Sequence, residues 1–152
     1  MSNVAIRPAT AEDLPAIVAM LADDVRGQGR EDASLPLDPR YEQAFAAIIA
    51  DFHQFLVVIE WEGEVIGTLQ LTLIPGLSRR GSWRGLIEAV RVRSDRRGFG
   101  VGARLIGWAV EVCRRHGCAT VELATHSSRG RAHRFYARLG FQPTHIGFKL
   151  EF

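Results

Sequence analysis

The hydrophobic pattern of the first third of the chain predicts a short strand and two helices. Residues 6–10 are typical of a strand that leads into a helix, with Thr10 as N-cap and Asp13 as a variant capping-box partner. The apolar positions of this helix recur at helical spacing: Leu14, Ile17, Val18 and Leu21. A polar loop over 23–38 and a second helix over about 39–52 follow. The second apolar stripe consists of Phe45, Ile48 and Ile49.

The middle of the chain changes to the period of strands. Residues 55–61 are apolar and β-rich, and a tight turn at Glu62-Gly63 connects them to a second strand over 65–74, which predicts a hairpin. In that second strand two rows alternate: Ile66, Thr68, Gln70, Thr72 and Ile74 against Leu69, Leu71 and Leu73. A loop over 75–85 and a third strand over 86–93 complete this part.

The last third returns to helices. Residues 100–116 are predicted to form a helix, 119–124 a strand and 131–139 a short helix that Gly140 ends. Residues 141–152 are expected to supply one or two terminal strands. The order β-α-α-β-β-β-α-β-α-β predicts a mixed α/β (α+β) fold, with a mostly antiparallel sheet, a βαβ crossover and flanking helices. No linker or repeat interrupts the chain, so residues 1–152 are expected to form a single domain.

Overall composition adds little to this predicted fold, but the distribution of charge along the chain points to a ligand. The 152 residues are 47% hydrophobic and 24% charged, as in ordinary globular proteins. No apolar run approaches a membrane span and no signal-peptide layout is present, so a cytoplasmic protein is expected. Residues 1–64 hold 12 acids and 4 bases, whereas residues 65–152 hold 5 acids and 15 bases. Such asymmetry suggests an anionic ligand for the second half, with an ordinary solvated, arginine-rich surface as the alternative.

One segment carries recognisable chemistry, namely residues 90–103, in which a strand leads through a glycine-rich turn into a helix. Unpaired N–H groups at a helix N-terminus form an anion site, and Gly98, Gly100 and Gly102 allow close backbone approach. A dinucleotide fingerprint matches Gly98, Gly100 and Ala103, with Glu122 about 20 residues further on. The interval before the glycines and the antiparallel run disfavour that interpretation. A P-loop is excluded because no lysine follows the glycines.

Three segments resemble the GCN5-related N-acetyltransferase (GNAT) superfamily. Residues 97–102 resemble its Q/R-x-x-G-x-G/A motif, residues 132–141 its A-x-x-F/L-Y-x-x-x-G-F segment, and residues 6–14 its usual opening. The resemblance spans nearly the whole chain. It implies a GNAT-like acyl-CoA N-acyltransferase fold with splayed parallel strands, acetyl-CoA as co-substrate and a primary amine as acceptor.

By this resemblance, the strand around residue 90 would pair with the pantetheine arm and polarise the thioester carbonyl, and the glycine turn would hold the pyrophosphate. The implied cofactor-binding residues are Val90, Arg91, Val92, Arg97, Gly98, Phe99, Gly100, Val101, Gly102, Ala103 and Arg129. Arg129 occupies a position where many family members have asparagine, and it, Arg131 or Arg134 could reach a phosphate instead.

The resemblance also implies the catalytic residues. Tyr136 is the candidate acid for the departing thiolate, although it could simply pack beside Phe135. An ammonium acceptor must lose a proton before it attacks, and Glu88 on the cofactor strand is the candidate base. A structural salt bridge is the alternative role for Glu88, and Glu122 is a second candidate base.

The acceptor is predicted to be a small amine that binds near residues 21–55. The acids in that stretch favour a cationic amine, and they include Asp23, Asp24, Glu31, Asp32, Asp38 and Asp51. A protein or peptide amine and a non-catalytic acyl-CoA-binding module remain alternatives. Neither a metal nor nucleic acid is expected, since Cys113, His116 and Cys118 lack zinc-site spacing and the arginines cluster at a glycine turn. A homodimer is possible, because dimers are frequent in the family.

Overall fold

The computed structural model describes residues 3–152. Its elements are β1 (Val4–Pro8), η1 (Ala11–Asp13), α1 (Leu14–Ala22), α2 (Pro39–Ile49), β2 (Gln54–Trp61), β3 (Glu64–Pro75), α3 (Ser78–Gly81), β4 (Trp83–Val92), η2 (Ser94–Arg96), α4 (Val101–Arg115), β5 (Thr120–Leu123) and α5 (Gly130–Arg138). The chain divides into two compact units, one that ends at Glu122 and one from Leu123 to Phe152.

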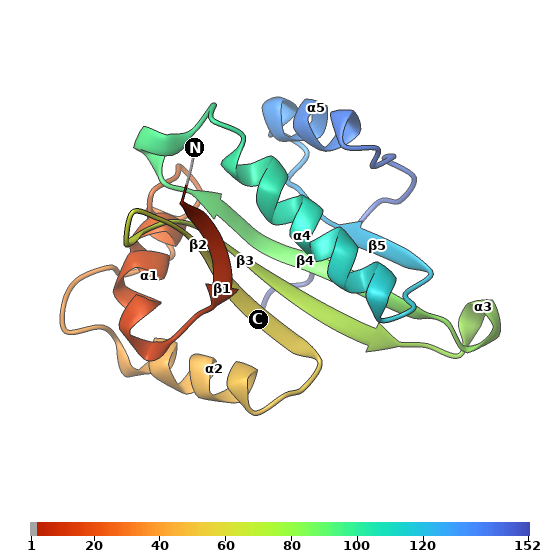
Figure 1. The fold of residues 1–152 in the computed structure, drawn as a ribbon, viewed down its shortest axis with the longest axis horizontal. Helices are drawn as coiled ribbons and strands as arrows, with labels where there is room; N and C mark the ends of the chain where they lie inside the picture. Colours follow the sequence, from red (N-terminus) through yellow and green to blue (C-terminus); the bar gives the residue numbers. More distant parts are fainter. Residues whose placement is uncertain (1–2) are drawn as a thin grey trace. The chain divides into compact units, whose positions relative to one another are not determined.

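The five strands form one sheet in the order β1-β2-β3-β4-β5 (Figure 1). Strands β1 to β4 form an antiparallel ladder, and β2 and β3 make the predicted hairpin at Glu62-Gly63. The Ala119 N–H donates a hydrogen bond to the Trp83 carbonyl oxygen at 2.8 Å, so β5 begins beside the beginning of β4. The two strands therefore run in the same direction, and α4 is the crossover between them. The predicted mixed sheet is confirmed.

Alternation along β2 and β3 separates the two faces of the sheet. On one face, Phe55 contacts Trp108 of α4 edge-on, with ring centroids 6.3 Å apart. On the other face, Val58 packs in a cluster with Leu14 and Ile17 of α1 and with Phe45 of α2. Helix α4 therefore covers one face, while α1 and α2 cover the opposite one. Figure 1 shows α4 lying along β3 and β4.

The start of α1 is fixed by a buried carboxylate. Asp13 is buried and accepts hydrogen bonds from the Thr10 N–H (2.7 Å) and from two nitrogens of the Arg7 guanidinium (2.7 and 3.0 Å). The Arg7 side chain also donates to Glu60 at 2.8 Å. Thr10 and Asp13 thus form the predicted capping box. It lies at the start of the short η1 turn, which leads directly into α1. The ion pair connects β1 and β2 to that turn.

Replacing Asp13 with asparagine is expected to lower the free energy of unfolding by about 2 kcal/mol at pH 7, because a charge-assisted network is lost in a buried place. The hydrogen bond from Arg7 lowers the pKa of Asp13 in the folded protein. A carboxylate with a lowered pKa stabilises above its unfolded pKa, about 4, and loses that effect as the pH falls. The difference between wild type and variant should therefore shrink below about pH 4. Urea unfolding at several pH values measures it, with the neighbouring Glu12→Gln as control; a constant difference would contradict the linkage.

Several predicted boundaries shift, and one prediction is wrong. Helix α2 ends at Ile49 rather than near residue 52, and the predicted loop after β3 contains the short α3, where Arg79 and Arg80 have φ values of 54° and 60°. The terminal strands predicted for residues 141–152 are not formed: no strand is assigned after β5 in residues 3–152. All residues from 142 to 152 are exposed, and an extended segment becomes a strand only when its backbone groups find a neighbouring strand.

Among the helices of residues 3–152, none has the length and apolarity needed to cross a membrane.

Candidate functional site

A bulge interrupts β4 where the sequence analysis places the reaction centre. Gln70 pairs with Glu88 and Thr68 with Arg91, so the two residues Ala89 and Val90 lie opposite one residue of β3. Ala89 has a φ of 52°, in the left-handed region that residues other than glycine seldom adopt. In a regular strand, residues three apart point to opposite faces of the sheet. The extra residue of the bulge shifts this alternation, so Glu88 and Arg91 both lie on the face that α1 and α2 cover in part.

Beyond the bulge, β4 has an open edge. The Arg93 N–H donates to the Ile66 carbonyl oxygen of β3 at 2.9 Å, so the main-chain groups of Val90 and Val92 point to the other edge. Strand β5 has only four residues and starts beside Trp83, so it does not extend along this part of the ten-residue β4. Side chains fill the gap in part: Arg91 donates to the Val90 carbonyl oxygen (2.9 Å) and Arg97 to that of Val92 (3.2 Å).

The glycine turn before α4 has the form of an anion site. Gly98 and Gly100 have φ values of 83° and 79°, and a side chain at either position would meet only open space. Within residues 3–152, none of the backbone N–H groups from Arg97 to Ala103 donates a hydrogen bond to another backbone group. An open set of N–H groups at the positive end of a 15-residue helix suits a phosphate.

The arginines around this turn differ in what they contact. Arg93 pairs with Asp95 (2.6 Å) and Glu64 (3.1 Å), and this hydrogen bonding lowers the pKa of Asp95. Arg96 lies over the ring of Trp61, 4.2 Å from its centroid. Arg97, which is exposed, bonds to β4 and lies 3.9 Å from Asp23. Arginines therefore surround the turn, but no arginine side chain fills the space beside Gly98 and Gly100.

A polar strip that the sequence analysis missed crosses the sheet beside Glu88. Gln54 of β2 accepts hydrogen bonds from Gln70 (3.0 Å) and Thr72 (2.8 Å) of β3, and Gln70 is the Cα partner of Glu88. The signal was present, since Gln70 and Thr72 belong to the row that alternates with three leucines in β3. A polar row on a sheet face not fully covered by helices gives hydrogen-bonding groups to a ligand.

The two candidate bases lie in different surroundings. Glu88 is exposed and, within residues 3–152, takes part in no ion pair or hydrogen bond through its side chain. The alternative of a structural salt bridge is therefore not what the structure shows. Glu122 instead pairs with Arg84 at 2.9 Å. Arg84 thus occupies the Glu122 carboxylate, whereas the Glu88 carboxylate is open to a ligand, so the arrangement favours Glu88 as the candidate base.

The second unit holds the other predicted residues. Tyr136 on α5 is half-buried, and its ring lies edge-on to those of Phe135 (centroids 5.1 Å apart) and Phe141 (6.0 Å). Arg129 is the N-cap residue of α5, and its carbonyl oxygen accepts a hydrogen bond from the His133 N–H. The aromatic packing expected as an alternative role of Tyr136 is thus present in the structure.

The acidic stretch over 21–55 is neutralised in part. Six of its seven acids bind donors in the folded chain: Asp23 with Arg97, Asp24 with Arg91, Glu31 with Arg30 and Tyr41, Asp32 with Ser34, Asp38 with Arg40, and Asp51 with His53. The hydrogen bond from Arg40 lowers the pKa of Asp38 to about 2. Because four of these acids pair with arginine, the stretch gives less support to a cationic acceptor than the sequence suggested.

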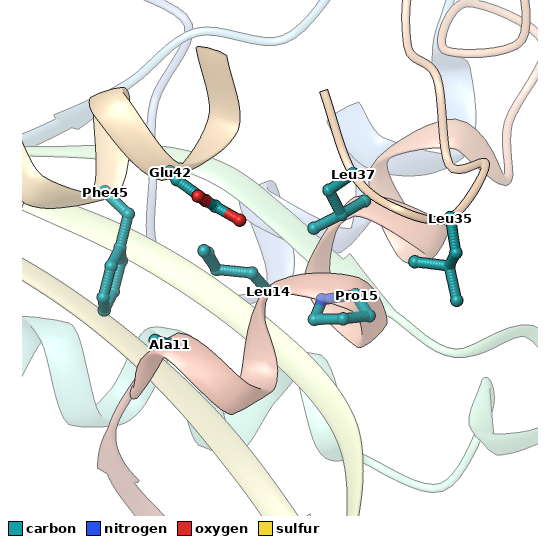
Figure 2. Close-up of a pocket in the computed structure, with 7 residues that line it drawn as sticks. All are labelled: Ala11, Leu14, Pro15, Leu35, Leu37, Glu42 and Phe45. Carbon is teal, nitrogen blue, oxygen red and sulfur yellow. The ribbon is translucent and has the colours of Figure 1, made fainter. Parts of the chain in front are cut away.

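A pocket of about 360 Å³ lies apart from the predicted cofactor residues (Figure 2). Its lining consists of Ala11, Leu14, Pro15, Leu35, Leu37, Glu42 and Phe45. Glu42 is its one charged lining residue, and none of the residues implied to bind the cofactor contributes to it.

Together, a bulged strand with an open edge and a glycine turn with open N–H groups suit an elongated anionic ligand. The model of the acetyltransferase (GNAT) family matches residues 18–141. The chain therefore belongs to the GNAT family of acetyltransferases, as the sequence motifs indicated. It is an acyltransferase, and acetyl-CoA is its co-substrate.

Individual relatives agree with this assignment. The aminoalkylphosphonate N-acetyltransferase of Salmonella typhimurium is 30% identical over 143 residues, which cover 94% of this chain and 88% of the relative. The L-methionine sulfoximine/L-methionine sulfone acetyltransferase of Pseudomonas aeruginosa is 30% identical over 148 residues, covering 92% and 81%. A crystal structure from Bacillus halodurans C-125, described as a transcriptional regulator, has a TM-score of 0.96 and 44% identity, covering 99% of this chain and 100% of that one.

Proposed function

We propose that this protein transfers the acetyl group of acetyl-CoA to the primary amine of a small molecule that also carries an anionic group, by direct attack in a ternary complex. The observation that carries the proposal is the position of Glu88. It is exposed and unpaired in the described chain, and it immediately precedes the bulge beyond which β4 offers an open edge.

The donor fits the groups that the chain leaves open. The N–H groups of Arg97 to Ala103 and the adjoining arginines would hold the pyrophosphate. The main-chain groups of Val90 and Val92 would pair with the amide groups of the pantetheine arm, and the N–H near Val90 would orient the thioester carbonyl. When bound, acetyl-CoA supplies an activated acetyl group whose leaving group is a thiolate.

Two side chains would manage protons. Glu88, through a water molecule, would take the proton that an ammonium acceptor must lose before it attacks. The phenol Oη of Tyr136 would hold the proton that the departing thiolate takes. A phenol suits that role because its pKa, near 10 in its ordinary state, is close to that of a thiol.

The acceptor class rests on two supports. The relatives from Salmonella typhimurium and Pseudomonas aeruginosa are named for acceptors that carry a phosphonate or an amino-acid carboxylate beside the amine. In this chain, four of the seven acids of residues 21–55 pair with arginine, and the polar strip of Gln54, Gln70 and Thr72 adds no negative charge beside Glu88. These two supports lead us to propose an anionic or zwitterionic acceptor in preference to the cationic one that the sequence favours.

Thiol release from acetyl-CoA across a panel of amines tests the proposal. The panel contains aminoalkylphosphonates, methionine sulfoximine, polyamines, uncharged amino sugars and a lysine-containing peptide. The highest kcat/KM is expected with an aminoalkylphosphonate or an amino acid. Highest activity on a polyamine or on the peptide would refute the acceptor class, and cofactor binding without turnover of any amine would refute the enzyme activity in favour of a binding module.

Replacing Glu88 with glutamine is expected to lower kcat/KM about 10-fold at pH 7, less than the loss of a base in direct contact, because a water molecule relays the proton. The loss should shrink at high pH, where the amine is already deprotonated. Initial rates from pH 6 to 10 measure this, with Glu122→Gln as the matched control. A loss that stays constant over that range would leave Glu88 without a role as base.

A further inference from the structure

Opposite charges flank the bulge of β4 on one face of the sheet. Glu88 lies immediately before the bulge and Arg91 immediately after it, and both lie on the face that α1 and α2 cover in part. Their Cα partners in β3, Gln70 and Thr68, are two residues apart, which spaces the two charged residues roughly 7 Å apart along the sheet. A carboxylate and a guanidinium at this spacing match a short zwitterion, whose ammonium group meets the carboxylate and whose anionic group meets the guanidinium.

The turn after α1 fixes the Arg91 guanidinium in place. Its Nε lies 3.3 Å from Asp24 Oδ2, and both side chains are only 18% exposed. The Gly27 N–H donates a hydrogen bond to the Asp24 carboxylate, and a Cβ at Gly27 would lie 2.0 Å from the Leu21 carbonyl oxygen, so the turn needs glycine here to hold Asp24. A guanidinium that is already held on one side loses less freedom when a ligand binds on another side, which favours binding.

The Nη1 nitrogen of Arg91 contacts the open edge of β4. It donates a hydrogen bond to the Val90 carbonyl oxygen at 2.9 Å. That carbonyl is one of the groups that the proposed function pairs with the pantetheine arm, and a donor from that arm would release Nη1 toward the face that carries Glu88. A guanidinium has five N–H groups in a planar fork, so Arg91 can keep its contact with Asp24 and bind a second anion.

We infer that Arg91 binds the anionic group of the acceptor and thereby determines acceptor specificity, with a short amino-phosphonate or amino-carboxylate as the ligand class. The inference rests on the proposed function, in which Glu88 takes the proton of the same acceptor. Arg84, the other arginine of β4 on this face, lies four residues before Glu88, roughly 13 Å along the strand, and pairs with Glu122. A short acceptor that meets Glu88 therefore reaches Arg91 and not Arg84.

Two acceptors that differ in the anion test the assignment. Aminoethylphosphonate carries an amine and an anion, whereas propylamine carries the amine alone. Replacing Arg91 with glutamine is expected to lower kcat/KM for aminoethylphosphonate about 50-fold, mainly through KM, because a charge-assisted contact with the phosphonate is lost. The value for propylamine should change less than about threefold. Arg91→Lys, which keeps the charge but not the planar fork, is expected to recover part of the loss.

The matched control is Arg84→Gln, which removes an exposed arginine of the same strand whose partner is Glu122. It should leave the ratio of kcat/KM for the two acceptors unchanged. An equal loss for both acceptors in Arg91→Gln would assign Arg91 a structural role, and a preference for aminoethylphosphonate that survives in Arg91→Gln would leave it without one in specificity; either overturns the inference alone. A wild type that prefers propylamine would instead refute the acceptor class of the proposed function, and the inference with it.

Binding of the anion alone gives a readout that does not depend on turnover. Ethylphosphonate has the anion but no amine, and phosphorus NMR follows its binding to the CoA-bound protein. Arg91→Gln should raise its dissociation constant at least about 10-fold. The double variant Asp24→Asn with Arg91→Gln, which leaves no carboxylate without its arginine, should show the same loss. Equal affinity in wild type and Arg91→Gln, or wild-type affinity restored in the double variant, would overturn the inference.

Discussion

Replacing Tyr136 with phenylalanine is expected to lower kcat about 100-fold while the dissociation constant of acetyl-CoA stays unchanged. The substitution removes only the hydroxyl group. The edge-on contacts with Phe135 and Phe141 need the ring alone, so they remain. Steady-state thiol release gives kcat, and titration calorimetry gives the affinity for acetyl-CoA.

The matched control for Tyr136 is Phe135→Leu, which disturbs the same aromatic cluster but retains the hydroxyl. It is expected to change kcat by less than about threefold. If Tyr136 only packs on α5, the order reverses: Tyr136→Phe would be silent and Phe135→Leu would cost more.

The double substitution Gly98→Ala and Gly100→Ala is expected to raise the dissociation constant of acetyl-CoA about 100-fold. Both glycines have φ near 80°, where a Cβ costs about 1–2 kcal/mol per residue. The turn would relax toward negative φ, and the N–H groups from Arg97 to Ala103 would no longer converge on one anion. Calorimetric titration with acetyl-CoA and with CoA measures the loss, which should be similar for both because they share the pyrophosphate.

A control pair with the same backbone strain is available in this chain. Gly63 and Gly117 have φ values of 81° and 73°, and an added Cβ at either would also meet open space. Replacing both with alanine should cost similar stability but leave the affinity for acetyl-CoA unchanged. An equal loss of affinity in the control pair would assign the effect to general destabilisation instead of the turn.

The regular elements could be predicted because each has a local signal. The capping residues Thr10 and Asp13, the turn at Glu62-Gly63 and the glycines before α4 all act within a few residues of their own positions. The segment over 141–152 carries an equally clear strand signal and yet forms no strand. Pairing is a property of two segments, so alternation predicts which residues can enter a sheet but not whether a neighbour is within reach.

The candidate site divides in the same way. Glycines at positive φ and a strand that leads into a helix were visible as a motif. The ion pairs that neutralise Asp24 and Asp38, the pairing of Glu122 with Arg84, and the strip from Gln54 to Gln70 depend on contacts between distant residues or on side-chain geometry. Net charge along a segment is therefore a weaker guide to the acceptor than the charges that remain unpaired in the folded chain.

The left-handed Ala89 has a consequence for how this protein can be altered. Residues before Ala89 have even numbers and residues after it odd numbers on the same face of the sheet. In the proposed function, one strand would therefore serve the acceptor and the donor through separate residues. Substitutions at Gln70 or Thr72 alter the neighbours of Glu88 without touching the main-chain groups of Val90 and Val92. The acceptor preference can consequently drift, or be redesigned, around a donor site that stays constant. Deleting Ala89 would remove the bulge. The residues before and after it would then share one alternation, and Glu88 could no longer change independently of Val90 and Val92.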